Sequence, residues 1–289
     1  MKLFYEDEYV KLIQGDCLEV MDNMINKNIK MNAIIADIPY GTTQCKWDEI
    51  IPFDDMWDKL LKLTNKTTPI VLFGNEPFSS KLRLSNLKMY KYDWKWNKVR
   101  GVGHLNAKKR PMMCIEDIMV FYDKQPTYNP QMREREKPRT SKNNATQQVY
   151  GKSQNNFVGE TLDKKYPLNL ITYSKSAQED MIYHPTQKPL SLIEYLISTY
   201  TNEGDTILDF TCGSGTTLVA AQNLHRKAYG IELDEKYCNI AKKRLEENLL
   251  HISNIKLEAG NSNCEVRSLR LQSWEVHENK MSKTSDDVI

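Results

Sequence analysis

The stretch LDFTCGSGTT, Leu208 to Thr217, decides the fold, because it has the pattern of a strand end, a glycine-bearing turn and a helix start. Gly213 and Gly215 let the backbone pass close to a ligand, and the N-terminus of the following helix offers free N–H groups. Glu232 ends the next apolar run, where its carboxylate can accept hydrogen bonds from both hydroxyls of a ribose. The third glycine of a dinucleotide loop and the Gly-Lys-Ser/Thr of a P-loop are both missing. We therefore expect a nucleoside ligand without a pyrophosphate; a plain structural turn is the alternative.

A second motif, ADIPYG, Ala36 to Gly41, ends an apolar run. The carboxylate of Asp37, the stiffening ring of Pro39 and the aromatic ring of Tyr40 make a slot for a planar base. Asp37 and the carbonyl of Ile38 can accept hydrogen bonds from an exocyclic amine, which localises its lone pair and stabilises the positive charge that develops on nitrogen. A sulfonium methyl group held in line then permits direct displacement, and the base must leave a duplex to enter the slot. Taken alone, the motif is better explained as a strand followed by a proline turn.

Apolar runs and helical spacings alternate along the chain, which is the signature of a parallel sheet. This predicts a doubly wound, mostly parallel α/β sheet whose ligands lie at the carboxyl ends of the strands. The expected strands are residues 8–14, 32–36, 69–74, 92–97, 115–122, 206–208 and 228–231, and the expected helices are residues 18–24, 54–63, 75–87, 190–201, 216–224 and 235–250.

Composition excludes several classes of protein. No run of 18 apolar residues exists, so we expect no membrane span, and the first residues lack the apolar core of a signal peptide. The six cysteines include no C-x-x-C pair, so we expect reduced cytoplasmic thiols and no metal site. A net charge of +2 by itself implies no partner.

Two stretches have the composition of a nucleic-acid surface. Lys88 to Arg110 contains eight Lys or Arg residues, one acid and several aromatic residues, which suits a phosphate backbone and splayed bases. Alternatively, its aromatic residues belong to the core. Gln125 to Met181 is polar and shows no periodicity, so we expect an inserted segment that orders on a polyanion, or else a flexible linker. The side chains expected on nucleic acid are Lys98, Arg100, His104, Lys108, Lys109, Arg110, Arg133, Arg135 and Arg139.

Four motifs, ADIPYG, HPTQKP, LDFTCGSGTT and GIELDEKYCNIAKKRL, together resemble those of the β-class DNA amino-methyltransferases, which methylate adenine N6 or cytosine N4. The resemblance spans about Gly15 to Leu250. It implies a Rossmann-like methyltransferase fold, S-adenosylmethionine as cofactor and double-stranded DNA as substrate, in a cytoplasmic protein of prokaryotic or phage type. Some relatives pair, so a homodimer fits the resemblance, as does a restriction endonuclease partner. The implied organisation is a catalytic domain of residues 1–124 and 182–260, a target-recognition insertion of residues 125–181 and a polar tail of residues 261–289.

The resemblance also implies roles for individual residues. Thr186 or Lys188 would meet the donor's carboxylate, and Asp16 would lie near the donor's adenine or merely cap a helix. The catalytic motif falls on Asp37, Ile38, Pro39 and Tyr40, and the donor contacts fall on Asp16, Asp37, Thr186, Lys188, Asp209, Thr211, Gly213, Ser214, Gly215, Thr216, Glu232 and Leu233.

Two positions depart from the family pattern. Ile38 replaces the first proline of the catalytic motif, which puts the rigidity of the loop in question, and Thr211 replaces a phenylalanine of the donor loop. The acid that begins the catalytic motif, Asp37, resembles the adenine-N6 members, whereas cytosine-N4 members more often begin with serine. Adenine-N6 methylation is therefore the predicted function. A cytosine-N4 enzyme and a non-catalytic DNA-binding relative are the alternatives.

Overall fold

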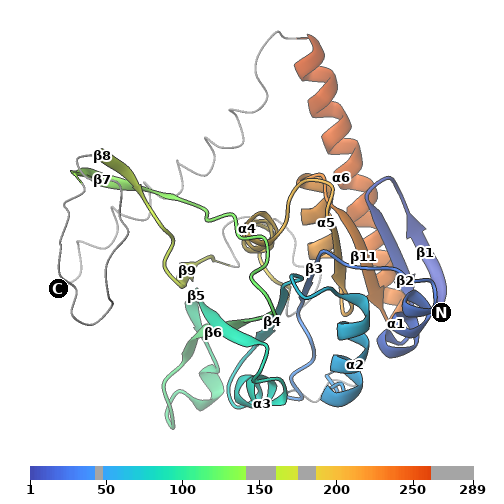
Figure 1. The fold of residues 1–289 in the computed structure, drawn as a ribbon, viewed down its shortest axis with the longest axis horizontal. Helices are drawn as coiled ribbons and strands as arrows, with labels where there is room; N and C mark the ends of the chain where they lie inside the picture. The colour runs from blue at the N-terminus through green and yellow to red at the C-terminus, as the bar shows by residue number, and fades with distance from the viewer. Residues whose placement is uncertain (43–47, 141–160, 175–186, 262–289) are drawn as a thin grey trace. The chain divides into compact units, whose positions relative to one another are not determined.

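The computed structural model describes residues 1–42, 48–140, 161–174 and 187–261 (Figure 1). Met1–Leu245 form one unit and Glu246–Ile289 a second, and Asp37, Asp209 and Glu232 all belong to the first. Helix α6 (Glu235–Asn261) begins in the first unit and continues past Leu250, where the sequence pattern placed its end. The expected polar tail lies almost wholly outside the described residues.

Within the described ranges, nine strands form one mixed sheet in the order β1-β2-β11-β10-β3-β4-β6-β5-β9. The five strands from β2 to β4 in this order are parallel to one another, and β9 is parallel to β5. β1 is antiparallel to β2, and β6 is antiparallel to both β4 and β5. The strands are β1 (Lys2–Glu6), β2 (Val10–Gln14), β3 (Ala33–Ala36), β4 (Ile70–Gly74), β5 (Tyr90–Val102), β6 (Met113–Phe121), β9 (Leu170–Thr172), β10 (Thr206–Asp209) and β11 (Lys227–Glu232).

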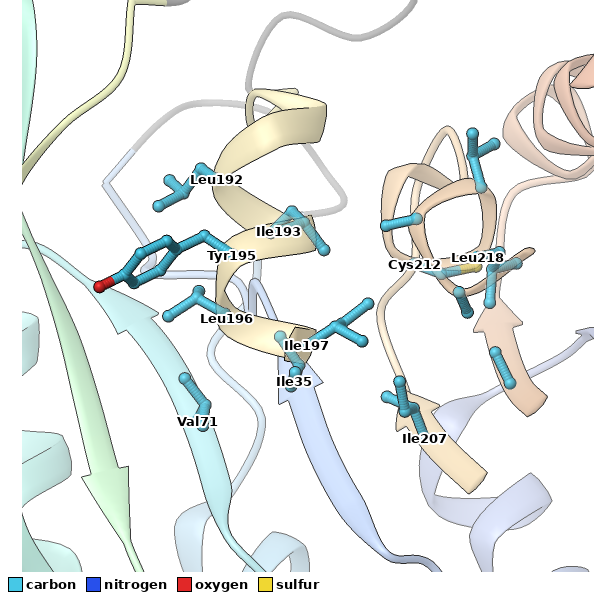
Figure 2. Close-up of a cluster of buried hydrophobic side chains, with 14 of the residues drawn as sticks. Ile35, Val71, Leu192, Ile193, Tyr195, Leu196, Ile197, Ile207, Cys212 and Leu218 are labelled. Carbon is cyan, nitrogen blue, oxygen red and sulfur yellow. The ribbon is translucent and has the colours of Figure 1, made fainter. Parts of the chain in front are cut away.

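Helices cover both faces of the sheet, which confirms the doubly wound α/β fold. Alternate residues of the central strands enter two separate clusters of buried side chains, as the pleat requires. Ile35, Val71 and Ile207 pack with side chains of α4 (Leu190–Tyr200) and α5 (Thr216–Asn223), as Figure 2 shows. Ile34 and Leu72 pack on the other side, with side chains of α1 (Cys17–Asn26), α2 (Phe53–Leu63) and α3 (Phe78–Ser85).

The direction of the crossovers reverses between β10 and β3. These strands are neighbours, with Ile207 opposite Ala33, but β10 leads through α5 to β11 on one side and β3 leads through α2 to β4 on the other. In open α/β sheets, ligands bind outside the carboxyl ends of the strands at this switch point. β10 ends at Asp209, and Asp37 directly follows β3. The two motifs therefore stand at one edge of the sheet.

The expected insertion contains strands that the sequence pattern did not reveal. β7 (Arg133–Thr140) and β8 (Thr161–Lys165) form an antiparallel two-stranded ribbon, and β9 joins the main sheet beside β5. The sequence of β7 does alternate with a period of two, but it alternates between positive and negative side chains (Arg133-Glu134-Arg135-Glu136) rather than between apolar and polar ones. Residues 141–160 and 175–181 lie outside the described ranges.

The tryptophans of the cationic stretch belong to the core rather than to a base-stacking surface. Trp94 and Trp96 are buried in β5, and Trp94 Nε1 donates a hydrogen bond of 2.6 Å to the Tyr200 hydroxyl. Trp96 Nε1 donates to the Tyr173 carbonyl at 2.9 Å. Their burial follows from the strand period, because alternate residues of β5 face α4.

In the part of the chain that the structure describes, no helix is both long enough and apolar enough to cross a membrane.

Candidate active site

The acceptor motif and the glycine loop are in direct contact. The hydroxyl of Thr211 donates a hydrogen bond to the backbone carbonyl of Asp37 over 3.1 Å. This contact follows from the pairing of β10 with β3, which brings the two strand ends together. Thr211, which departs from the family pattern, therefore ties the two loops to each other.

The glycine loop is organised around the carboxylate of Glu232 at the end of β11. Its Oε2 accepts a hydrogen bond from the N–H of Gly213 at 2.9 Å, and its Oε1 accepts one from Asp234 at 2.8 Å. Burial raises the pKa of Glu232 despite these bonds. A Cβ added to Gly213 would meet no atom within 4 Å, so the loop backbone borders open space at that point. Such a cradle fits a nucleoside whose ribose reaches Glu232.

Gly215 serves a different purpose from Gly213. Its φ of 79° lies in the left-handed region, and a Cβ there would stand 2.9 Å from the Cβ of Ala241 in α6. The glycine therefore permits close packing of the loop against α6.

Asp209, at the end of β10 next to the loop, is 4% exposed. Burial raises its pKa to about 7, although hydrogen bonds from Thr217 and from the Thr211 N–H oppose the shift.

A buried arginine of α6 fixes the start of α5. Arg244 Nη1 donates to the Ser214 carbonyl at 2.7 Å and to the Thr216 hydroxyl at 3.0 Å. Ser214 in turn donates from its hydroxyl to Gln187 Oε1 at 3.3 Å, which connects the loop to the HPTQKP motif. Sequence reasoning missed Arg244, although a cation on the apolar side of a predicted helix was an available signal.

The acceptor loop is held by a carboxylate that sequence reasoning also missed. Asp48 Oδ1 accepts hydrogen bonds from the N–H groups of Tyr40 at 2.8 Å and Gly41 at 2.9 Å, and Oδ2 accepts one from Thr42 at 2.8 Å. Ile38 is 3% exposed and packs in the core. The loop that lacks the family's first proline is therefore anchored by Asp48 and by the burial of Ile38.

A network of buried charges surrounds Asp37. Its Oδ1 accepts a hydrogen bond of 2.6 Å from the Tyr40 hydroxyl, and its Oδ2 lies 2.5 Å from Lys188 Nζ. Glu116 on β6 contacts Lys188 at 3.0 Å and Lys98 at 3.1 Å, and its Oε1 lies 3.0 Å from the Tyr40 hydroxyl. Tyr40 has one hydroxyl proton, so it donates to one of the two carboxylates at a time. Two ammonium groups thus balance two carboxylates.

The contacts within this network shift the pKa values of its charged groups. Burial by itself would raise the pKa of Glu116, but the ammonium groups of Lys188 and Lys98 outweigh burial and hold this pKa at about 2. Burial would likewise lower the pKa of Lys188, but Asp37 and Glu116 raise it.

The ring of Tyr40 stacks on Phe78 with 5.1 Å between the two ring centroids, which fixes the plane of the Tyr40 ring.

The other residues expected at the donor site differ in their exposure and their contacts. Asp16 is exposed and caps α1, accepting hydrogen bonds from the N–H groups of Leu18 at 2.9 Å and Glu19 at 3.1 Å. The neighbouring Gly15 N–H donates to the Glu232 carbonyl, so the cap lies beside the end of β11. Leu233 is 65% exposed. Thr186 lies outside the described residues.

Among the expected DNA contacts, Lys98 requires a correction. It is buried against Glu116 because the strand period turns it inward, so it is not a surface cation. Arg133 and Arg135 on β7 are partly buried, and the side chain of Arg139 is outside the described set. The exposed members are Arg100, His104, Lys108, Lys109 and Arg110.

Across the described ranges, no cluster of three or more His, Cys, Asp or Glu side chains is placed to hold a metal ion.

A doubly wound sheet, a glycine loop followed by an acid at the next strand end, and an Asp-x-Pro-Tyr loop at the same switch point define the class of Rossmann-like methyltransferases. Comparisons with known proteins agree. The chain is 27% identical over 253 residues to the type II methyltransferase M.HpaI of Haemophilus parainfluenzae, covering 82% of this chain and 74% of that protein. The crystal structure of the M1.HpyAVI–SAM complex superposes with a TM-score of 0.57 at 26% identity, covering 82% of this chain and 98% of that one.

The cytosine-N4-specific PvuII DNA methyltransferase shares the fold, with a TM-score of 0.60 at 15% identity, covering 88% of this chain and 94% of that one. The model of the N6_N4_Mtase family, described as DNA methylase, matches residues 31–243. The chain belongs to this family. It is a DNA methyltransferase that uses S-adenosylmethionine.

We predict that Arg244→Met weakens binding of S-adenosylmethionine about tenfold or more, because hydrogen bonds to charged groups contribute about 1.5–3 kcal/mol each and the Ser214 carbonyl and Thr216 hydroxyl lose theirs. Isothermal titration calorimetry checks this. Lys243→Met, at the exposed neighbouring position of α6, is the control and should bind normally. Equal affinity in both variants would contradict the role given to Arg244.

We predict that Glu116→Gln lowers the unfolding free energy at neutral pH, because Lys98 loses the carboxylate it pairs with and Lys188 loses one of its two. The folded-state pKa of Glu116, about 2, is below the ordinary 4.5, so its stabilisation is complete above about pH 4.5 and is lost as pH falls towards 2. The advantage of the wild type over the variant, at most about 3 kcal/mol, should shrink over this range.

Urea unfolding between pH 6 and 3 measures this difference. Glu134→Gln removes an exposed carboxylate that lies 3.5 Å from Lys164, and it is the control that should show no such dependence. A difference between wild type and Glu116→Gln that stayed constant with pH would refute the prediction.

Proposed function

We propose that this methyltransferase modifies the exocyclic N6 amine of an adenine everted from double-stranded DNA. The observation that carries the proposal is the contact between Thr211 and the Asp37 carbonyl, which supports transfer between ligands held by the two loops. The acid at the start of the acceptor motif favours adenine over cytosine within a family that includes both specificities.

The chain's own groups suit an amine acceptor. A carboxylate offers about four lone-pair positions, so Asp37 retains acceptor capacity beside its bonds to Tyr40 and Lys188. A hydrogen bond from the amine to Asp37, and another to the carbonyl of Ile38, would localise the nitrogen lone pair and stabilise the positive charge that forms on nitrogen. The methylated nitrogen then releases one proton to water. Because both acceptors are fixed before the base enters, little reorganisation is needed.

The donor site is assigned to the opposite loop. S-adenosylmethionine supplies a sulfonium methyl group, whose C–S bond breaks as the N–C bond forms. Glu232 would hold the ribose hydroxyls, and the backbone at Gly213 would border the adenosine. Asp16 would lie near the adenine edge. We assign Lys188 to the acceptor side, because its ammonium is engaged by Asp37 and Glu116 rather than directed to the donor's carboxylate.

The β7–β8 ribbon is the proposed DNA-reading element of the insertion. Arg133 lies directly opposite Lys165, so these cations share one face of the ribbon, whereas Glu134 pairs with Lys164 on the other. Like charges placed directly opposite destabilise a sheet, and a polyanion on that face would relieve the repulsion. The major groove of B-DNA is wide enough to admit a two-stranded ribbon.

We also propose a cytoplasmic setting of prokaryotic or phage type. A homodimer and an accompanying restriction endonuclease remain predictions. Light scattering of the purified protein would test the first, and purification from its native cells would test the second.

The product of the reaction separates the candidate functions. The protein is incubated with tritiated S-adenosylmethionine and genomic DNA, and the modified nucleosides are identified by chromatography and mass spectrometry. We expect N6-methyladenine. N4-methylcytosine would replace the proposal with its alternative, and no transfer at all would support a non-catalytic relative.

Asp37→Ala should abolish transfer while duplex binding persists, because the variant loses an acceptor of the amine but no DNA-facing cation. Tritium transfer and a binding titration on the same DNA measure the two properties. Full activity of the variant would show that the acceptor slot has been assigned wrongly.

We predict that Lys165→Gln weakens DNA binding and lowers the slope of log K against log salt by about one, because one fewer counterion is released. Lys164→Gln is matched in charge, adjacent in sequence and on the opposite face of the ribbon, so it should change the slope little. Fluorescence anisotropy at several salt concentrations checks this. Equal effects of the two variants would contradict the assignment of the cationic face.

A further inference from the structure

The β5–β6 hairpin projects from the catalytic edge of the sheet. β4 and β5 are both antiparallel to β6, so they run in the same direction and their carboxyl ends lie at one edge. Asp117 of β6 pairs with Gly74, the last residue of β4, yet β6 begins four residues earlier, at Met113. At about 3.3 Å per residue, the hairpin extends roughly 13 Å beyond the end of β4. We call residues 99–112 the hairpin arm.

The root of the arm is joined to the acceptor site. Lys98, the residue before the arm, pairs with Glu116, and Glu116 contacts Lys188 and the Tyr40 hydroxyl. The arm therefore starts at the network that holds Asp37. This connection places it beside the slot that receives the everted base.

The backbone of the arm is bent at its root. Val99 has a φ of 68°, an outlier for a β-branched residue, and the register of β5 against β6 shifts between Asn97 and Val102. A Cβ on Gly101 would lie 2.8 Å from Met112 Cβ, so the two sides of the arm pack closely there. Irregularities of this kind bend a strand and re-aim its side chains, and they occur often beside active sites.

The tip of the arm combines an apolar side chain with cations. Leu105 is 87% exposed in the short 3-10 helix η1 (His104–Asn106), and Val102 and Met112 are 50% and 44% exposed. Single exposed leucines are ordinary. Here, however, the leucine stands on an arm that contains no acid, among the exposed cations Arg100, Lys108, Lys109 and Arg110. A cationic surface draws the arm to the DNA backbone, and the apolar tip is suited to the base stack.

We infer that Leu105 inserts into the duplex and fills the space that the everted base leaves in the stack. The inference rests on the proposed transfer to an everted base. Removing a base from the stack costs stacking and pairing energy, and apolar side chains that enter between base steps stabilise the distorted duplex. In this account Leu105 is a positioning residue: it stabilises the everted state and does not touch the reacting atoms.

The test compares a paired target with one that is already easy to evert. The target site is first found by methylation-aware sequencing of DNA modified by the wild-type protein. Two duplexes carry this site, one with the target base paired and one with an abasic position opposite it. A mismatched or unpaired base costs less to evert, so insertion matters less for the second duplex.

Leu105→Ala should reduce kcat/KM on the paired duplex about tenfold or more, since the alanine is too short to enter the stack and offset the cost of unstacking the base. On the abasic duplex, it should stay within about twofold of the wild type. Leu105→Met, which keeps an apolar side chain, should restore activity on the paired duplex. Leu84→Ala is the control, because Leu84 is a 72% exposed leucine of α3 and should behave as wild type on both duplexes.

An equal loss on the two duplexes, or no loss on either, would overturn the inference. Binding of S-adenosylmethionine by each variant shows that it is folded. If the wild-type protein methylates neither duplex nor genomic DNA, the proposed function fails instead. That outcome is distinct from a wild type that is active and a Leu105→Ala variant that shows no selective loss.

Discussion

The structure depends on the pairing of β10 with β3. These strands are separated by most of the chain, yet their parallel register puts Asp209 and Asp37 at neighbouring strand ends. The crossovers leave in opposite directions from this pair, and in open α/β sheets this switch point is where ligands bind. The hydrogen bond from Thr211 to the Asp37 carbonyl then fixes one loop against the other. Transfer between two ligands requires that they be held next to each other, and the pairing of β10 with β3 provides this.

Charge balance is the second constraint on the site. Burying a carboxylate is costly unless cations and hydrogen bonds compensate it. Here Lys188 contacts both Asp37 and Glu116, and Lys98 completes the balance from β5. The arrangement holds the charged Asp37 at the acceptor slot, with Lys188 and Lys98 as the compensating cations. It also links the slot mechanically to the β5–β6 hairpin, which carries the exposed cations.

The positions of Asp37, Tyr40, Gly213 and Glu232 could be predicted from the sequence, because each lies at the end of a strand or in the loop that follows one. Glu116 and Asp48 could not, since their roles arise from contacts across the fold. Tyr40 and Glu116 are 76 residues apart, and Lys188 and Asp37 are 151 apart. Periodicity predicts which face a residue occupies, but not which side chain meets it there. Lys98 shows the same limit, because a lysine counted as a surface cation is buried by the pleat of its strand.

The most direct test of the account is a crystal structure of the protein with a non-reactive analogue of S-adenosylmethionine and a duplex containing its site. We expect the donor to lie on the loop of Gly213 and the everted base to lie against Asp37 and Tyr40, with its amine facing the donor's sulfur centre above β10 and β3. A donor and a base bound on opposite sides of the sheet, or a base held away from Asp37, would contradict it.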